Sequence, residues 1–359
     1  MPSPRPTIRV IALETGCSPM TVSRALRGDR YVDAGKRKRI LSVARRLGYR
    51  PNPAATQLCA QRGKKAMEIR EFVGMLVGKE DPNWAQSWKH QNFLKGVQAR
   101  ASQFGYRIVQ LWLHEPGWTP ERVASYLEAR NVRGIVLMPE VYSDWPREVS
   151  QLLSTRCCAV IGSIPVKHSF HFAANDDFST AKTATQMALA RGYRRPGFVV
   201  LRPVDDLIEH RYTAAFHSVQ RALPPENQIP ELWLNSFESA EFVGWFQRHR
   251  PDVVITHNRR IAVEDWLKPL KQRVPRDVGW ITLDIVPGDD QVTGIDARSE
   301  LVGVAAMDLV LDQMQRDERG VPPFQKGVFI EGLWREGRTL RKPSAKTSNN
   351  RFSRIRSAA

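Results

Sequence analysis

The stretch Ser18-Pro19-Met20-Thr21-Val22-Ser23-Arg24-Ala25-Leu26-Arg27 decides how this chain is organised. Ser18 is a favourable N-cap, and Pro19 suits the first helical position, where an N–H would have no partner in any case. At helical spacing the segment divides into an apolar stripe of Val22, Ala25 and Leu26 and an opposite face of Met20, Ser23, Arg24 and Arg27. Small polar and guanidinium groups on an exposed face can read base edges in a DNA major groove. For these residues alone, a solvated helix with two arginines is the alternative.

The flanking segments predict two further helices. Thr7 is placed to cap the first, which ends at Gly16, and Gly16-Cys17-Ser18 has the length of the turn in a helix-turn-helix. Asp33 is placed to cap the third, which ends at Gly48. The apolar positions of these two helices are Ile8, Ile11, Ala12 and Thr15 in the first and Ile40, Val43, Ala44 and Leu47 in the third. We therefore expect a three-helix headpiece of about fifty residues, near the lower limit for independent folding.

Charge is distributed unevenly along the chain. With 359 residues, of which 42% are hydrophobic, the protein can bury a sizeable core in two or three domains. Of the net charge of +17, residues 1–65 carry +12 and residues 341–359 carry +6, so the segment between them sums to −1. A general polyanion binder is one possibility for so basic a chain. The confinement of charge to a headpiece and a tail instead indicates DNA binding at one end.

Other classes of protein find little support. The first residues lack an apolar signal segment, no run of eighteen apolar residues occurs, and the four cysteines lack metal-ligand spacing. We therefore expect a cytoplasmic, nucleoid-associated protein with no membrane partner, no metal and no cofactor. The sequence has no Gly-x-Ser-x-Gly nucleophile elbow, no phosphate-binding loop and no His-x-x-x-His zinc-binding pair, so no enzyme activity is expected. The scattered histidines are interpreted as core or surface residues. Three acidic doublets are interpreted as solvated turns: Asp176-Asp177, Asp205-Asp206 and Asp289-Asp290.

Beyond residue 70, short apolar runs alternate with amphipathic helical patterns. This alternation is typical of parallel sheets with helices on both faces. Strands are expected at 72–77, 108–113, 134–138, 159–162, 197–201, 252–256 and 278–283. Helices are expected, for example, at 91–104, 119–130, 179–191 and 211–222.

These motifs resemble the lactose-repressor (LacI/GalR) family. In the headpiece the resemblance rests on Thr7-Ile8, Ala12, Gly16-Cys17-Ser18, Thr21-Val22-Ser23-Arg24, Val32 and Leu47-Gly48-Tyr49-Arg50-Pro51-Asn52. In the core it rests more loosely on Asn175-Asp176 and on residues 189–198, 273–278 and 327–340. Val10 departs from the family, which commonly has an acidic residue there. The resemblance implies an all-α helix-turn-helix headpiece and an α/β periplasmic-binding-protein-like core of two doubly wound subdomains.

The resemblance also implies domain boundaries. The headpiece is expected at 1–50, a hinge helix and linker at 51–69, the effector-binding and dimerisation core at 70–340, and a basic tail at 341–359. Within the core, the N-subdomain is expected at about 70–163 plus 297–326, and the C-subdomain at about 173–296 plus 327–340. The tail is rich in Ser, Arg and Lys, so we expect it to be disordered and solubilising. Non-specific DNA contact by the tail is the alternative.

The implied function is transcriptional regulation. A protein of this family is expected to be a homodimeric repressor on near-palindromic double-stranded operator DNA, controlled by a small effector. Leu58, in the hinge at 53–61, matches a leucine that is wedged into the minor groove; packing against the core is its alternative. The residues expected to contact DNA are Thr7, Ser18, Pro19, Met20, Thr21, Ser23, Arg24, Arg27, Tyr31, Asn52, Ala55 and Leu58.

A ligand of this fold binds beyond the carboxyl ends of the strands, in the cleft between subdomains. Asn258 and Asp284 each follow an expected strand there. Arg211 opens a helix, although the family's arginine usually lies one residue further on, where Tyr212 stands. Arg259 occupies a position where the family usually has an acid. The residues expected to bind effector are Trp84, Trp88, Arg211, Asn258 and Asp284.

The two indoles suit a saccharide, so the expected effector is a carbohydrate; helix packing is the alternative for both tryptophans. Two other functions fit parts of the sequence. A solute-binding transport protein is disfavoured by the headpiece and the missing signal segment. An architectural or effector-independent DNA-binding regulator with a vestigial cleft is favoured by the displaced Arg211 and by Arg259.

Overall fold

The computed structural model describes residues 7–26, 32–47, 49, 71–138, 147–162, 170–258, 261–286 and 288–342, without the side chains of residues 9, 23 and 147–150. Contacts divide the chain into Met1–Glu68 and Ile69–Ala359, and each unit is described by itself. The expected hinge helix and linker, and the tail beyond residue 342, lie outside the described residues.

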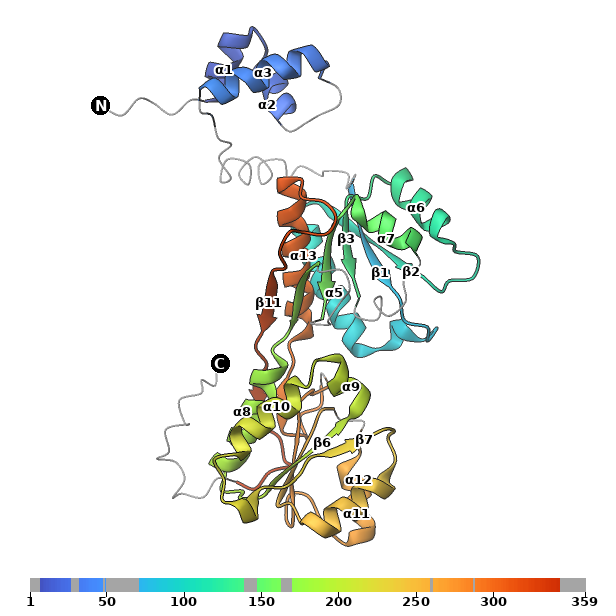
Figure 1. Ribbon diagram of the computed structural model, residues 1–359, viewed down its shortest axis with the longest axis vertical. Coiled ribbons are helices and arrows are strands. Elements are labelled where there is room, and N and C mark those ends of the chain that lie inside the picture. The colour runs from blue at the N-terminus through green and yellow to red at the C-terminus, as the bar shows by residue number, and fades with distance from the viewer. Residues whose placement is uncertain are drawn as a thin grey trace, which may run out of the picture. The chain divides into compact units, whose positions relative to one another are not determined.

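The first unit contains the three expected helices, α1 (Ile8–Thr15), α2 (Pro19–Leu26) and α3 (Ala34–Arg46) (Figure 1). They bury one apolar cluster of Ile11, Ala12, Val22, Ala25, Val32, Ile40 and Ala44. Gly16 ends α1 in the left-handed conformation (φ 65°), and the Cys17 N–H then donates to the Ala12 carbonyl at 3.1 Å. A side chain is disfavoured at positive φ, so glycine permits the tight turn into α2.

Two of the three expected side-chain caps are present. Ser18 Oγ accepts a hydrogen bond from the Thr21 N–H at 3.1 Å, and Asp33 Oδ2 accepts one from the Lys36 N–H at 3.0 Å. Thr7 is the N-cap of α1, but its side chain makes no capping bond; its backbone carbonyl accepts the first bond of the helix, from the Ile11 N–H at 3.2 Å.

The second unit contains two subdomains, each built on a sheet. Among the described residues, the first sheet has the strand order β11-β5-β4-β3-β1-β2, and all its pairs are parallel. Its strands are β1 (Glu71–Val77), β2 (Tyr106–Trp112), β3 (Gly134–Leu137), β4 (Cys157–Ile161), β5 (His171–Asn175) and β11 (Gly327–Ile330). Its helical segments are η1 (Trp84–Gln86), α5 (Trp88–Gln103), α6 (Pro120–Ala129), α7 (Arg147–Ser154) and α13 (Ser299–Arg316).

The second sheet has the order β12-β10-β9-β8-β6-β7 among the described residues, with only the β10–β12 pair antiparallel. Its strands are β6 (Pro196–Leu201), β7 (Leu232–Leu234), β8 (Val253–Thr256), β9 (Gly279–Thr282), β10 (Gly294–Asp296) and β12 (Leu333–Arg335). Its helical segments are α8 (Asp177–Ala190), α9 (Arg202–Leu207), α10 (Arg211–Gln220), η3 (Pro225–Asn227), α11 (Ser239–His249), α12 (Val263–Leu267) and η4 (Lys268–Leu270).

The expected subdomain boundaries at 173 and 327 need correction. β5 pairs with β4, and β11 pairs with β5, so residues 171–175 and 327–330 belong to the first sheet. The chain therefore crosses between subdomains just after Asn175, after Asp296 and after Ile330. These crossings lie together: the Asn175 side-chain amide donates to the Ala297 carbonyl, and the Asp176 N–H donates to the Ile330 carbonyl at 3.0 Å. No strand was predicted at 171–175 from the local sequence pattern. These residues form a strand because they pair with β4 and β11.

Helix α13 packs closely against α5 of the first subdomain. Two glycines permit this approach. A Cβ at Gly96 would lie 1.9 Å from the Glu300 carbonyl oxygen, and one at Gly303 would lie 2.2 Å from the Phe93 carbonyl oxygen. Neither backbone can yield easily, so the contact requires glycine on both helices.

Candidate nucleic-acid interface and ligand pocket

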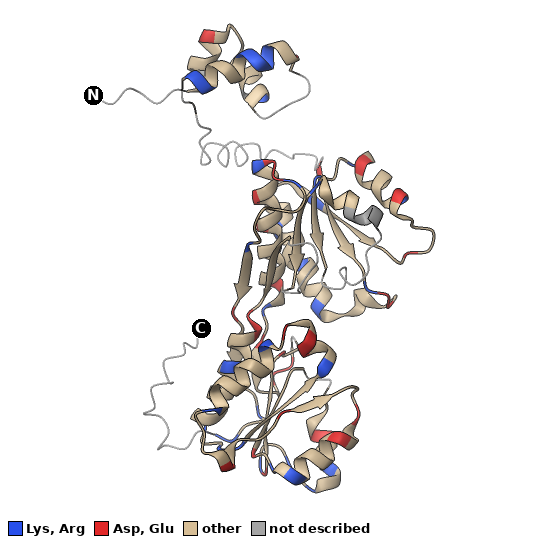
Figure 2. Ribbon diagram, viewed as in Figure 1, with Lys and Arg blue, Asp and Glu red and all other residues tan. Residues whose placement is uncertain are grey.

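Helix α2 presents a polar outer face because its apolar side chains enter the headpiece core. Val22 and Ala25 are buried, whereas Ser18, Pro19, Met20 and Arg24 are exposed and Thr21 is half-buried. Met20 is 62% exposed, whereas methionine side chains are more often buried. Lys and Arg outnumber acids on the headpiece ribbon (Figure 2). The amino end of α2 can therefore meet a phosphate-lined groove.

The structure describes some of the expected DNA-contacting residues and not others. Thr7 is exposed at the start of α1, in the same unit as α2. The side chain of Ser23 is not described, and five expected contacts lie outside the described residues: Arg27, Tyr31, Asn52, Ala55 and Leu58.

A pocket of about 400 Å³ lies between the start of α5 in the first subdomain and the strand ends of the second. It is lined by Ser87, Trp88, Lys89, Val204, Tyr212, His257, Asn258, Asp284 and Val286. Three of the expected effector-binding residues, Trp88, Asn258 and Asp284, are thus brought together. Four of the lining residues follow the ends of β8 and β9, the place where open parallel sheets bind ligands.

Asp284 and Lys89 join the two subdomains across this pocket. The Lys89 ammonium lies 3.4 Å from Asp284 Oδ2, and the Asp284 side chain is only 12% exposed. Burial raises the pKa of Asp284, an effect that Lys89 opposes. The second oxygen, Oδ1, is buried and accepts no hydrogen bond within the described residues. A buried carboxylate oxygen without a donor is costly, so a ligand hydroxyl or ammonium would be favoured there.

Tyr212 lines the pocket where the family's arginine is usual, and Asp177 lies behind it. A hydrogen bond joins the Tyr212 hydroxyl to the Asp177 carboxylate. Burial raises the pKa of Asp177 to about 6, while Lys89, the Tyr212 hydroxyl and Arg211 oppose the rise. Burial, with help from nearby carboxylates, also raises the pKa of Tyr212 well above its usual value. Tyr212 is thus a neutral hydrogen-bonding group where an arginine would be a cation.

Two expected effector contacts are not among the pocket-lining residues. Arg211 Nη2 lies 3.3 Å from Glu209 Oε2, and the guanidinium carbon lies over the Phe329 ring, 5.1 Å from its centroid. Trp84 packs against the core of the first subdomain and contacts the His90 ring edge-to-face at 6.2 Å. For Trp84 the helix-packing alternative describes the observed contacts. The one-residue offset at Arg211 turns its side chain out of the pocket and brings Tyr212 in.

Sequence reasoning missed several groups near this pocket. His257 is buried, accepts from the Leu201 N–H at 3.4 Å and contacts the Asn258 side chain at 2.8 Å, so it orients that amide. Its place directly after β8 was the available signal. The interpretation of the acidic doublets as solvated turns is wrong for Asp177 and Asp205, which are 8% and 0% exposed. Each points inward from a helix that follows a strand.

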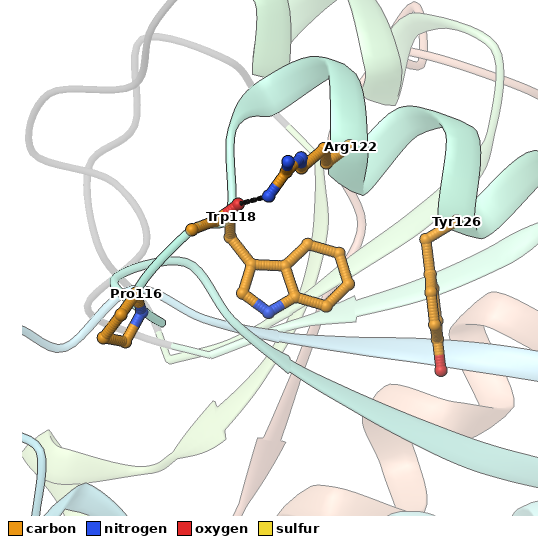
Figure 3. A pocket seen from close by; sticks show the side chains of 5 residues that line it. Pro116, Trp118, Arg122 and Tyr126 are labelled. Carbon is orange, nitrogen blue, oxygen red and sulfur yellow. Dashed lines mark hydrogen bonds between the residues drawn. The ribbon is translucent and has the colours of Figure 1, made fainter.

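A second pocket, of about 410 Å³, lies at the loop between β2 and α6 (Figure 3). The Trp118 and Tyr126 rings meet edge-to-face at 5.3 Å, and Arg122 donates to the Gly117 carbonyl at 2.5 Å. It shares no lining residue with the first pocket, and no sequence expectation concerned it.

Neither a membrane span nor a metal cluster is found in the part of the chain that the structure describes. No described helix has the length and apolar character needed to cross a bilayer. Over the same residues, no three His, Cys, Asp or Glu side chains are grouped to hold a metal ion.

Two family descriptions match the chain. Residues 7–52 match bacterial regulatory proteins of the lacI family, and residues 185–332 match the periplasmic binding protein-like domain. The HTH-type transcriptional regulator PtxS of Pseudomonas putida is 26% identical over 340 residues, which cover 91% of this chain and 96% of that protein. Catabolite control protein A of Streptococcus mutans is 29% identical over 202 residues, 56% of either chain.

Solved structures share the fold. The transcriptional regulator CelR in complex with cellobiose matches with a TM-score of 0.57 at 19% identity, covering 93% of this chain and 100% of that one. The lac repressor dimer bound to operator and the anti-inducer ONPF matches with a TM-score of 0.55 at 16% identity, covering 94% and 99%. Both matches extend over the headpiece and the two-subdomain core.

Proposed function

The chain belongs to the lacI family of bacterial regulatory proteins, a family of DNA-binding transcriptional regulators, and on that premise we propose that it is a homodimeric repressor controlled by a carbohydrate. One observation carries the proposal. A helix-turn-helix with an exposed polar face and a core pocket with an unsatisfied carboxylate oxygen occur in the same chain.

Operator reading is proposed for the amino end of α2. Pro19, Met20, Thr21, Ser23 and Arg24 would contact base edges, since this end of a recognition helix enters the major groove. One headpiece reads few base pairs, so two headpieces related by a twofold axis would read a near-palindrome. The hinge at 53–61, with Leu58 as a minor-groove wedge, would order only on DNA, because a helix this short is marginal alone.

A neutral, hydroxyl-rich effector suits the pocket best. Asp284 Oδ1 needs a donor, the half-buried Trp88 lines the same space, and Tyr212 offers a hydroxyl instead of a cation. Sugar hydroxyls supply donors, and an indole ring packs on the apolar face of a sugar. Cellobiose is bound in the CelR structure and ribose in a related regulator from Enterococcus faecium, which supports this class of ligand.

The effector-independent regulator with a vestigial cleft is the second candidate. The Lys89–Asp284 ion pair favours it, because it links the two subdomains without a ligand.

The test begins with the full-length chain and a library of random duplexes, from which the bound sequence is selected. Thermal unfolding is then measured against a panel of neutral sugars, and operator affinity is measured with each sugar that raises Tm. We expect one sugar to raise Tm and to change operator affinity about 5- to 150-fold. Selection of a near-palindrome with no response to any sugar would favour the vestigial cleft.

A matched pair of variants ties the response to the pocket. Asp284→Asn keeps the side-chain volume but removes the charge, so we expect it to abolish the sugar-induced rise in Tm while operator affinity without sugar stays within about threefold. Asp290→Asn makes the same change on an exposed loop and should respond to sugar as the wild type does. Equal sugar responses of both variants would contradict the proposed pocket.

A further inference from the structure

The second subdomain has a strongly basic end, opposite to the ligand pocket. The pocket residues Asn258 and Asp284 follow the carboxyl ends of β8 and β9. The other end of the same sheet is formed by residues 191–195, 221–226, 248–252, 271–277 and 336–342. These five segments, here named the basic end, contain twelve Lys/Arg and four Asp/Glu.

Hydrogen bonds join the five segments into one surface. The Arg195 guanidinium donates to backbone carbonyls of two other segments, those of Glu226, His249 and Arg250. The Arg341 N–H donates to the Tyr193 hydroxyl at 3.0 Å, and its guanidinium donates to the Asp277 carbonyl at 3.0 Å. The basic residues therefore lie on adjoining loops of one surface and are not scattered over the subdomain. Figure 2 marks Lys and Arg in blue at the lower end of this subdomain.

Three of the four acids of the basic end are engaged locally. The Asp252 carboxylate accepts from the backbone N–H groups of Arg194 and Arg195 at 2.7 and 2.9 Å. Asp277 accepts from the Arg273 N–H at 3.0 Å, and Glu336 pairs with Arg191. These acids hold the loops and leave a net positive surface.

Several cations of this surface face solvent. Arg194, Arg221, Arg248, Arg250 and Lys271 are all exposed. The pKa of the neighbouring, half-buried His249 is lowered by burial and then by the charges of Arg248 and Arg195.

Helix termini explain only part of this charge. α8, α10 and α11 all end in or next to the basic end, and each carboxyl terminus carries roughly half a negative charge that favours a nearby cation. Three termini would be balanced by one or two cations. The basic end holds eight more cations than acids, an excess that helix stability does not require.

The chemistry of the surface favours nucleic acid over protein as its partner. Protein interfaces have an apolar or aromatic centre, yet none of the large exposed hydrophobic side chains among the described residues lies in the five segments. Ten of the twelve cations are arginines, whose planar forks bind phosphate with two parallel hydrogen bonds. The sequence after Lys342 adds four more Lys/Arg and no acid.

We propose that the basic end is a second nucleic-acid surface, which holds duplex DNA by its phosphates and without sequence preference. It is separate from the helix-turn-helix in the sequence and needs neither an operator nor an effector. With the headpieces on one DNA segment, the core then retains a second segment, so a bound regulator bridges two duplexes.

The test is a two-duplex capture with the full-length protein. A biotinylated 40-bp duplex of scrambled sequence is held on beads and loaded with protein, unbound protein is removed, and a fluorescent second 40-bp duplex is added. The variant Arg194→Gln/Arg248→Gln/Lys271→Gln removes three exposed charges of the basic end. The control, Arg107→Gln/Arg130→Gln/Lys182→Gln, removes three exposed charges elsewhere in the second unit.

We expect the wild type and the control to capture the second duplex equally, and the basic-end variant to capture at least tenfold less at equal protein loading. Capture should also weaken steeply with salt, because each phosphate contact releases a counterion. Capture that survives in the basic-end variant but is lost in Arg24→Ala would overturn the proposal, since the second duplex would then be held by a headpiece. Retention of poly-glutamate but not of duplex would overturn it in favour of an acidic protein partner.

Discussion

Compared with the wild type, the variant Asp177→Asn should gain stability as the pH rises from acid to neutral. Asp177 is 8% exposed, and burial raises its pKa from 3.8 to about 6. A shift of two units corresponds to about 3 kcal/mol, at about 1.36 kcal/mol per unit. Above pH 6 the carboxylate is ionised in both the folded and the unfolded chain, and the folded state bears that cost. Below about pH 4 it is protonated in both, and the cost vanishes.

The direction in which the free energy of unfolding changes with pH follows from proton binding. Between pH 4 and pH 6 the folded chain holds a proton on Asp177 that the unfolded chain has released, so this group lowers the free energy of unfolding as pH rises. Asparagine cannot ionise. The free energy of unfolding of Asp177→Asn minus that of the wild type should therefore increase by up to about 3 kcal/mol from pH 4 to pH 7.

The assay is urea unfolding followed by tryptophan fluorescence at pH 4, 5, 6 and 7. Comparing the difference across pH cancels effects of the substitution that do not depend on pH. Tyr212→Phe removes a group that lowers the pKa of Asp177, so it should extend the sloping region to higher pH. A difference that stays constant or shrinks from pH 4 to pH 7 would refute the claim that burial destabilises this carboxylate.

Two other predictions use single substitutions. Gly303→Ala should lower the free energy of unfolding by about 2–3 kcal/mol, because its Cβ would meet the Phe93 carbonyl oxygen at 2.2 Å; Gly244→Ala, in a helix with open space around it, should instead raise it by about 0.5–1 kcal/mol in the same urea titration. Arg24→Ala should weaken binding to the selected operator by about 1–3 kcal/mol and relax preference at one base pair, measured by fluorescence anisotropy. An equal loss on random duplex would make Arg24 a phosphate contact.

The headpiece and the class of the core could be predicted from the amino-acid sequence alone. Caps, turns and apolar spacing are local properties, so Ser18 and Asp33 predicted where α2 and α3 begin, and Gly16 predicted where α1 ends. Alternating apolar runs and helices predicted parallel sheets for the same reason. The strand-end rule also placed Asn258 and Asp284 in the pocket, because the residue after a parallel strand always emerges at the same edge.

Which side chains share the pocket, and where the chain crosses between subdomains, depends on tertiary packing and could not be predicted from local sequence. β5 and β11 join the first sheet through pairing with strands distant in sequence, and no local pattern records that. The one-residue difference between Arg211 and Tyr212 is 100° around a helix, enough to exchange an inward tyrosine for an outward arginine. Asp177 resembles any helix-capping acid in the sequence. Its burial, and hence its raised pKa, arises because the subdomain packs around it.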